Sequence, residues 1–129
     1  MKIARIVFGI LYLGGALANI ILAVLNSPQS YHIFADEALI PFYREAWATL
    51  IIPNMVLFIS LLVAYEIKLG LLFLTGRRFL KIALAGGALF CLGTVPFSLQ
   101  VLSTNLPLGL IQVFLLWKEL RRKTAMKEA

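Results

Sequence analysis

Glu66 is the residue of this sequence with the greatest potential for chemistry, because it stands almost alone as a charge. Between Glu45 and Arg77 lie 31 residues, of which only Glu66 and Lys68 are charged. An ionisable side chain in such an apolar stretch is costly unless it is paired, neutralised or faces a cavity. Glu66 is therefore a candidate proton-handling or substrate-binding carboxylate. The alternative, which we prefer because no second acidic residue lies in an apolar run to form a relay, is a structural hydrogen bond.

Four polar residues make up the candidate intramembrane site. We expect Asn19, Tyr65 and Gln112 to accompany Glu66, since these side chains can hydrogen-bond inside a helix bundle. A helical hairpin around Gly76 and Arg77 would place Glu66 opposite Gly86 and Gly87, about 15 Å from the turn and near mid-membrane. This geometry predicts a carboxyl group clamped against small residues.

No catalytic set and no metal site is predicted. His32 and Asp36 could share a helical face, but a metal site needs three or four ligands, and an exposed loop histidine is the preferred interpretation. The single cysteine, Cys91, excludes an intrachain disulfide and a dithiol motif. The sequence therefore specifies no reaction.

The elements that must position Glu66 are transmembrane helices. Hydrophobic residues make up 61% of the 129 residues and charged residues 14%, and the mean hydropathy is +0.93. These values predict an integral membrane protein, an all-α four-helix bundle with spans of about 20 residues each. We expect one domain with spans at about 4–25, 46–75, 79–102 and 106–121, an outer loop or interfacial helix at 26–45, and a basic tail at 122–129.

The charges predict the orientation in the membrane. Ten of the twelve Lys and Arg residues fall in three clusters at alternate ends of the apolar runs. By the positive-inside rule both termini are cytoplasmic, segment 26–45 is outside, and the protein is a multi-pass protein of the cell (inner) membrane. The basic tail is expected to contact anionic lipid headgroups. A nucleic-acid partner is not expected, because no aromatic residues are interleaved with the tail as a stacking platform requires.

Small residues and prolines predict packing faces and breaks. Gly14 with Ala18, and Ala83 with Gly87 beside Gly86, have the spacing of close helix contacts in lipid. The run 46–76 is longer than the hydrocarbon thickness, so we expect a kink at Pro53, with Asn54 satisfying a freed carbonyl. Segment 103–107 is predicted to form the turn between the last two spans.

Several short motifs resemble those of one family. They are Ala4-Arg5-Ile6-Val7-Phe8-Gly9 before Gly14-Gly15, then Glu66-Ile67-Lys68-Leu69-Gly70-Leu71-Leu72-Phe73-Leu74 with Gly76-Arg77, and finally Lys81-Ile82-Ala83-Leu84 before Gly86-Gly87. The chain resembles the DoxX-like group of small four-helix bacterial membrane proteins. The resemblance implies a four-helix bundle, and a quinone is implied by the resemblance alone. No cofactor is predicted from the residues themselves.

Three functions remain open. The first is a non-enzymatic accessory or scaffold subunit of a membrane assembly, such as a redox complex. The partners would be further copies of the chain in a homo-oligomer, or the other subunits of a larger membrane complex. The second is a small-molecule or proton-coupled carrier that uses Glu66. The third, ranked last, is a lipid-active membrane enzyme, which would need more than one buried acid. Replacing Glu66 by Gln is expected to separate them.

Overall fold

The described part of the protein is helical throughout. The computed structural model describes residues 2–25 and 33–128. The helices are α1 (Lys2–Leu25), α2 (Ile33–Glu37), α3 (Pro41–Ala46), α4 (Met55–Thr75), α5 (Leu80–Thr94) and α6 (Leu99–Glu128). Four segments are long and apolar enough to cross a membrane, namely Lys2–Leu22, Pro41–Thr75, Arg77–Phe97 and Leu99–Arg122. The all-helical part of the predicted fold class is confirmed for these residues.

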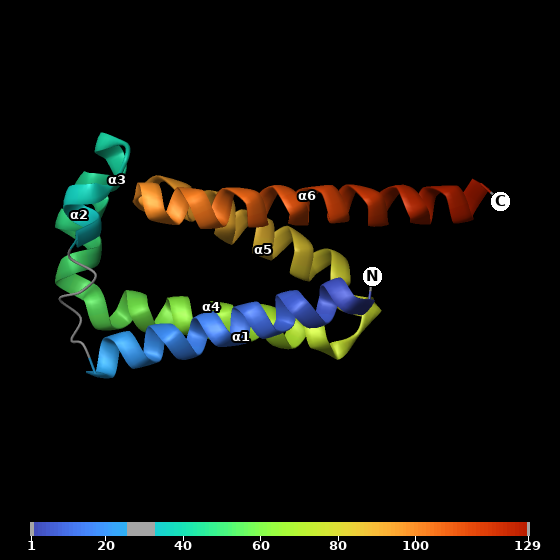
Figure 1. The fold of residues 1–129 in the computed structure, drawn as a ribbon, viewed down its shortest axis with the longest axis horizontal. Coiled ribbons are helices and arrows are strands. Elements are labelled where there is room, and N and C mark those ends of the chain that lie inside the picture. The colour runs from blue at the N-terminus through green and yellow to red at the C-terminus, as the bar shows by residue number, and fades with distance from the viewer. Residues whose placement is uncertain (1, 26–32, 129) are drawn as a thin grey trace.

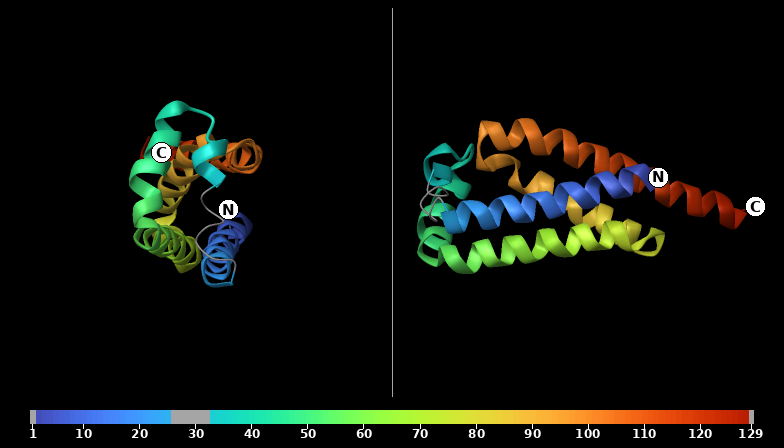
Figure 2. Two further views of the ribbon diagram at one scale, coloured as in Figure 1. Left: turned by 90° about the vertical axis from the view of Figure 1, so that its left-hand side faces the viewer. Right: turned by 60° about the horizontal axis from the view of Figure 1, so that its bottom comes forward.

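The four long helices form two pairs. Helix α1 packs along α4, and α5 packs along α6, with fewer contacts between the pairs. Figure 1 shows the two pairs as two layers. We call the end that holds the α4–α5 turn and Lys2 the proximal end, and the opposite end, with α2, α3 and the α5–α6 turn, the distal end. The views in Figure 2 show α2 and α3 lying across the distal end of the long helices.

The pairs meet in an apolar core near the proximal end. Its largest fully buried hydrophobic side chains are Phe73, Leu80 and Leu84, from α4 and α5. The ring of Phe73 stacks between those of Phe8 and Tyr12 of α1, with centroids 5.5 and 5.8 Å away. This cluster joins α1, α4 and α5 and closes the bundle at that end.

Helices α1 and α4 approach closely at two glycines. A Cβ at Gly9 would lie 2.6 Å from Cγ of Leu74, and one at Gly70 would lie 2.6 Å from Cγ of Leu13. Each position therefore needs glycine for the backbones to approach.

The predicted packing face at Gly14 and Ala18 is wrong within this chain. Both residues are exposed, and a Cβ at Gly14 would meet open space. The inward stripe of α1 runs instead through Phe8, Tyr12 and Ala16, which are spaced four apart. Positions two residues from Ala16 point to the opposite side of a helix. On α5, Ala83 and Gly87 are both buried.

The α4–α5 turn begins at Gly76, where the sequence predicts the end of the helix. Its φ of 135° lies in the region that favours glycine. The turn of 3₁₀-helix Arg77–Phe79 then leads into α5. Arg77 forms an ion pair with the buried Glu119 of α6, with Nε 3.2 Å from Oε1 and Nη2 3.2 Å from Oε2. The contact fastens the turn to the fourth long helix.

The predicted turn at 103–107 is wrong, and the spans 79–102 and 106–121 shift with it. The chain turns at Val95–Phe97, and α6 begins at Leu99 and continues through Pro107. Ser98 is extended, and its hydroxyl accepts a hydrogen bond from the Val101 N–H at 3.2 Å, as an N-cap does. Helix α6 also continues through the predicted tail as far as Glu128.

The long second run bends at Pro53, as expected. A π-helical turn, Trp47–Ile51, and a 3₁₀ turn, Ile52–Asn54, precede α4. The Asn54 amide donates to the Leu50 carbonyl at 3.0 Å, beside the carbonyl that proline leaves without its usual partner. The bend directs Trp47 and α3 across the end of the bundle.

Helices α2 and α3 are fastened to the α5–α6 turn. The Leu39 N–H donates to the Pro96 carbonyl at 2.8 Å, and the Tyr43 hydroxyl donates to the Gly93 carbonyl at 2.7 Å. The ring of Trp47 meets that of Phe97 edge-on, with centroids 5.1 Å apart. These contacts form a cap over the distal end.

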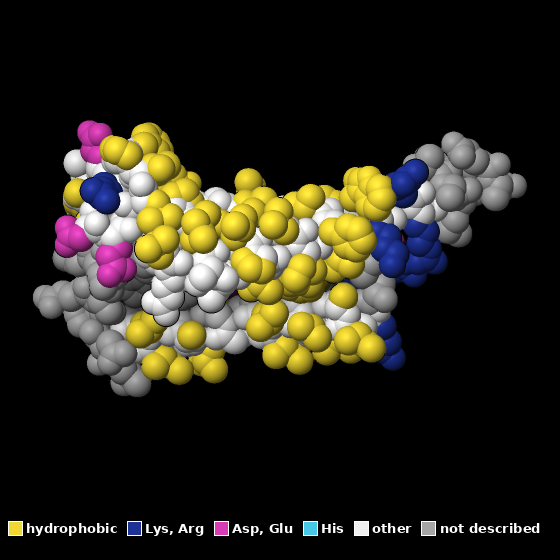
Figure 3. All heavy atoms as spheres, turned by 45° about the horizontal axis from the view of Figure 1, so that its top comes forward, with side chains coloured by type: hydrophobic (Ala, Val, Ile, Leu, Met, Phe, Trp, Pro, Cys, Tyr) yellow, Lys and Arg dark blue, Asp and Glu magenta, His cyan; other side chains and the backbone are white. Residues whose placement is uncertain are grey.

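Charged side chains gather at the two ends of the molecule. Figure 3 shows Asp and Glu side chains with some Lys or Arg at the distal end, Lys and Arg at the proximal end, and hydrophobic side chains over the surface between them. This surface includes large side chains that are more than half exposed, such as Val56 of α4, Leu89 of α5 and Phe114 of α6. An apolar belt between charged ends is typical of a membrane protein.

Candidate functional site

Glu66 is buried at the contact between α4 and α1. Its Oε2 accepts a hydrogen bond of 2.9 Å from the side-chain amide of Asn19, which also donates to the Gly15 carbonyl at 3.1 Å. A Cβ at Gly15 would lie 2.9 Å from Oε1 of Glu66. Glycine at position 15 therefore makes room for the carboxyl group, and Asn19 orients it.

The expectation that Glu66 faces Gly86 and Gly87 is wrong. Tyr65 is the residue that reaches α5, where its hydroxyl donates to the Gly86 carbonyl at 2.8 Å. The prediction assumed that α4 packs mainly on α5, whereas its main neighbour is α1. Successive residues of a helix point about 100° apart, so Tyr65 points to α5 and Glu66 to α1.

Gln112 belongs to a different polar cluster. It lies opposite Gly87, where a Cβ would collide with its amide oxygen. The Tyr12 hydroxyl donates to that oxygen at 3.1 Å, and the Gln112 amide nitrogen lies 3.4 Å from Sγ of Cys91. This buried cluster joins α1, α5 and α6. The four predicted site residues are thus divided, with Asn19 beside Glu66, and Gln112 and Tyr65 elsewhere.

A cavity of about 350 Å³ opens beside Glu66 and Asn19. Its other polar residues are Thr94 of α5 and Asn105 of α6, and the Asn105 amide donates to the Thr94 hydroxyl at 2.6 Å. The remaining wall is hydrophobic and consists of Leu22, Trp47, Leu62, Phe90, Phe97 and Val101. All four long helices thus contribute to one space, which we call the polar cavity.

Sequence reasoning missed Thr94 and Asn105. The composition of segment 103–107 predicts a turn, where a polar side chain such as that of Asn105 needs no further explanation. The missed signal is Ser98 after Pro96, because an N-cap residue there starts α6 early enough to turn Asn105 inward. Thr94 offered no signal of its own.

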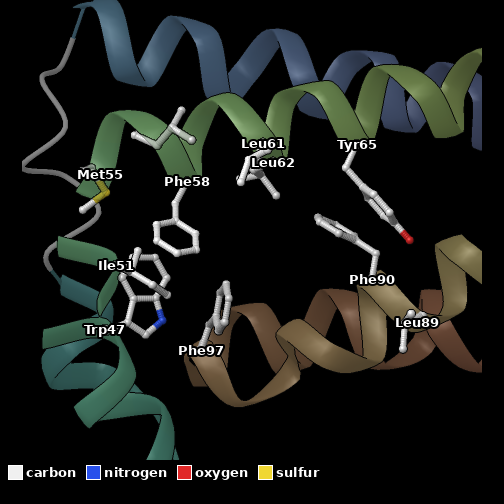
Figure 4. A pocket seen from close by; sticks show the side chains of 11 residues that line it. Trp47, Ile51, Met55, Phe58, Leu61, Leu62, Tyr65, Leu89, Phe90 and Phe97 are labelled. Carbon is white, nitrogen blue, oxygen red and sulfur yellow. The ribbon is translucent and has the colours of Figure 1, made fainter. Parts of the chain in front are cut away.

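A second cavity, of about 390 Å³, adjoins the polar cavity. Figure 4 shows side chains of α4 on one side of it and Phe90 of α5 and Phe97 of the Val95–Phe97 turn on the other, with Trp47 and Ile51 at one end. Nearly all of its lining is aliphatic or aromatic, so we call it the apolar cavity. Four side chains line both cavities, namely Trp47, Leu62, Phe90 and Phe97.

Within the described ranges, the side chains suit polar binding better than metal coordination. No group of three or more His, Cys, Asp and Glu side chains gathers among those residues. His32, considered above with Asp36, lies outside them. Arg77 and Glu119 form an ion pair in the described part of the chain, whereas no Lys or Arg of that part forms one with Glu66. The polar cavity thus presents a carboxyl group, two amides and a hydroxyl.

Comparison with known proteins gives no relative from which a role could be transferred. The chain matches no protein-family model, no curated protein and no solved structure closely enough to assign it to a family.

Proposed function

We propose that this chain is a multi-pass protein of the cell membrane with both termini in the cytoplasm. Four apolar segments of sufficient length support this proposal, as does the gathering of Lys and Arg at the proximal end. The distal end, with the cap formed by α2 and α3, would then face the outside. The resemblance to the DoxX-like proteins, as a four-helix bundle, is consistent with this arrangement.

We further propose that the protein binds a small molecule in the polar cavity, with Glu66 as the main anchor. The observation that carries this proposal is a buried carboxyl group, without an ion-pair partner in the described residues, that lines a cavity of about 350 Å³. Protein interiors are close-packed, and ligand sites have volumes of about 300–1,000 Å³. A purely structural hydrogen bond between Glu66 and Asn19 would need no such space.

Glu66→Gln tests this function. The amide keeps the shape of the side chain and can still accept from Asn19, so the fold should persist while an anchor based on charge is lost. Native mass spectrometry of the gently solubilised protein should show a bound small molecule in the wild type and its loss in the variant. Glu37→Gln, a change to an exposed acid at the distal end, is the matched control and should retain the molecule.

Two results would contradict the proposal. One is the same bound molecule, in the same amount, in the wild type and in Glu66→Gln. The other is a fall in melting temperature for Glu66→Gln as large as that for Phe73→Ala, a truncation of the core. The second result would assign Glu66 to helix packing.

An accessory role in a membrane assembly is the second candidate. The observation that favours it is the exposed pair Gly14 and Ala18 on α1, with open space at Gly14, because small residues suit close helix contacts in lipid. Gly14→Leu should then dissociate a homo-oligomer or larger complex in native mass spectrometry and leave the monomer folded. An unchanged assembly would exclude this face as the contact.

A further inference from the structure

The two cavities adjoin and differ in chemistry. Both are lined by Trp47, Leu62, Phe90 and Phe97, so these four side chains form the boundary between them. On one side of the boundary lie Glu66 and Asn105, and on the other the lining is aliphatic and aromatic. A molecule that fills both spaces must be polar at one end and apolar along the rest.

The apolar cavity reaches the side of the bundle. Two of its lining residues, Leu61 of α4 and Leu89 of α5, are 56% and 72% exposed, on the apolar surface between the charged ends. In a membrane this surface would face lipid. A molecule could therefore enter the apolar cavity sideways from the bilayer, past these side chains of α4 and α5.

The polar groups favour a head group that donates hydrogen bonds and carries positive charge. Glu66 has no cationic partner among the described residues, and its Oε2 is held by one amide of Asn19. The Asn105 amide nitrogen donates to Thr94, and its carbonyl oxygen accepts a 3.4 Å contact from the Thr104 hydroxyl. The second lone pair of that oxygen remains as an acceptor for a ligand in the polar cavity. An ammonium group supplies three donors and no acceptor. An anionic head group would instead meet the carboxylate.

We infer that the molecule bound at Glu66 is a single-chain amphiphile with a small cationic head, of the long-chain primary amine class, which enters between α4 and α5. This inference rests on the binding function proposed above and names the class of ligand. The head group lies at Glu66 and Asn105, and the chain lies in the apolar cavity.

The two tryptophans provide a direct test. Trp47 lines both cavities, whereas Trp117 lies on the surface of α6, under the guanidinium of Arg121. Trp117→Phe leaves Trp47 as the single tryptophan, because the sequence has two. The probes are a long-chain primary amine with bromine at the chain end, which quenches tryptophan on contact, and the matched bromo-alcohol and bromo-sulfate. The protein is held in nanodiscs of zwitterionic lipid.

The amine should quench Trp47 at a mole fraction roughly ten- to a hundredfold lower than the alcohol, because a hydrogen bond to a charged group adds about 1.5–3 kcal/mol. Adding Glu66→Gln should abolish this difference. Trp47→Phe, which leaves Trp117 as the reporter, should show no preference among the three probes.

A second variant tests the chain site without changing a polar group. Leu62→Phe places a larger side chain at the boundary of both cavities and should weaken quenching of Trp47 by the amine at least tenfold. Leu57→Phe, on an exposed position of α4 that lines neither cavity, is the matched control and should have no effect. If Glu66→Gln fails to fold, this pair and the preference of the wild type for amine over alcohol decide the question.

Equal quenching by amine and alcohol, or strongest quenching by the sulfate, would overturn the inference. So would unchanged quenching in Leu62→Phe. The binding function would survive these results if native mass spectrometry still shows a small molecule that depends on Glu66. Absence of that molecule together with absence of quenching would remove both proposals.

Discussion

At the scale of single residues, the neighbours Gly14 and Gly15 have different surroundings. A Cβ at Gly15 would press on the carboxyl group of Glu66, whereas a Cβ at Gly14 would meet open space. In a helix, alanine is more favourable than glycine by roughly 0.5–1 kcal/mol when nothing else changes. Replacing each glycine by alanine therefore distinguishes two effects. Both substitutions change helix propensity, but only Gly15→Ala displaces the carboxyl group of Glu66.

Gly15→Ala is expected to weaken ligand binding without a large loss of stability. The carboxyl group is the far end of a flexible side chain and can shift, but the shift disturbs the hydrogen bond that its Oε2 accepts from the Asn19 amide. The amine should therefore lose about tenfold or more in quenching of Trp47, as for loss of one hydrogen bond to a charged group. Gly14→Ala should bind as the wild type does, and equal effects of the two substitutions would contradict this account.

The residue scale also shows what the sequence could predict about the site. The isolated charge identified Glu66, and Asn19 was among its proposed companions. The direction of each side chain depended on which helix lies beside α4, and hydrophobic pattern does not specify the order of helices around a bundle. For that reason the sequence predicts Gln112 and Tyr65 beside Glu66, whereas they contact Tyr12 and Gly86, and it does not predict Thr94 and Asn105 at the polar cavity.

At the scale of elements, the ion pair between Arg77 and Glu119 joins the α4–α5 turn to α6. Glu119 is buried, whereas 45% of the Arg77 side-chain surface is exposed. Removing the exposed partner leaves a buried carboxylate without a cation, and removing both leaves no such charge. The pair therefore predicts different effects for the single and the double replacement.

Arg77→Gln should reduce stability by about 1 kcal/mol, a value kept low because the arginine is partly exposed. The double variant Arg77→Gln with Glu119→Gln should recover part of that loss. Arg78→Gln changes an exposed neighbour that lies against the Phe79 ring and serves as the control. Thermal unfolding in mild detergent measures all four proteins. A double variant less stable than Arg77→Gln would contradict the expectation.

The helix boundaries show why one turn was predicted and another was not. Gly76 is a single strong signal, followed by two arginines. At 103–107 the polar residues and Pro107 have the composition of a turn, but the hydroxyls of Ser103 and Thr104 lie within hydrogen-bond distance of the Gln100 carbonyl of their own helix. Such local bonds let Ser and Thr remain inside a helix. Composition alone therefore placed the turn several residues too late.

At the scale of the whole molecule, the charge distribution predicts its orientation. The distal end carries Asp36, Glu37 and Glu45 beside Arg44, and the proximal end carries most of the basic residues. We expect Asp36→Cys to react with a membrane-impermeant maleimide on intact cells, and Arg78→Cys to react only after the cells are opened. The native Cys91 is buried and should not contribute. The reverse pattern would invert the proposed topology.

The closed core at the proximal end limits how a bound molecule could leave. Between Glu66 and the proximal end of α4 lies the close-packed core around Phe73, which joins α1, α4 and α5. A passage through that core would separate apolar contacts of three helices, whereas the side of the apolar cavity is lined by Leu61 and Leu89, which are largely exposed. A molecule held by one copy would therefore depart by its route of entry. Such a protein would retain its ligand and hand it on within one leaflet, without moving it across the bilayer.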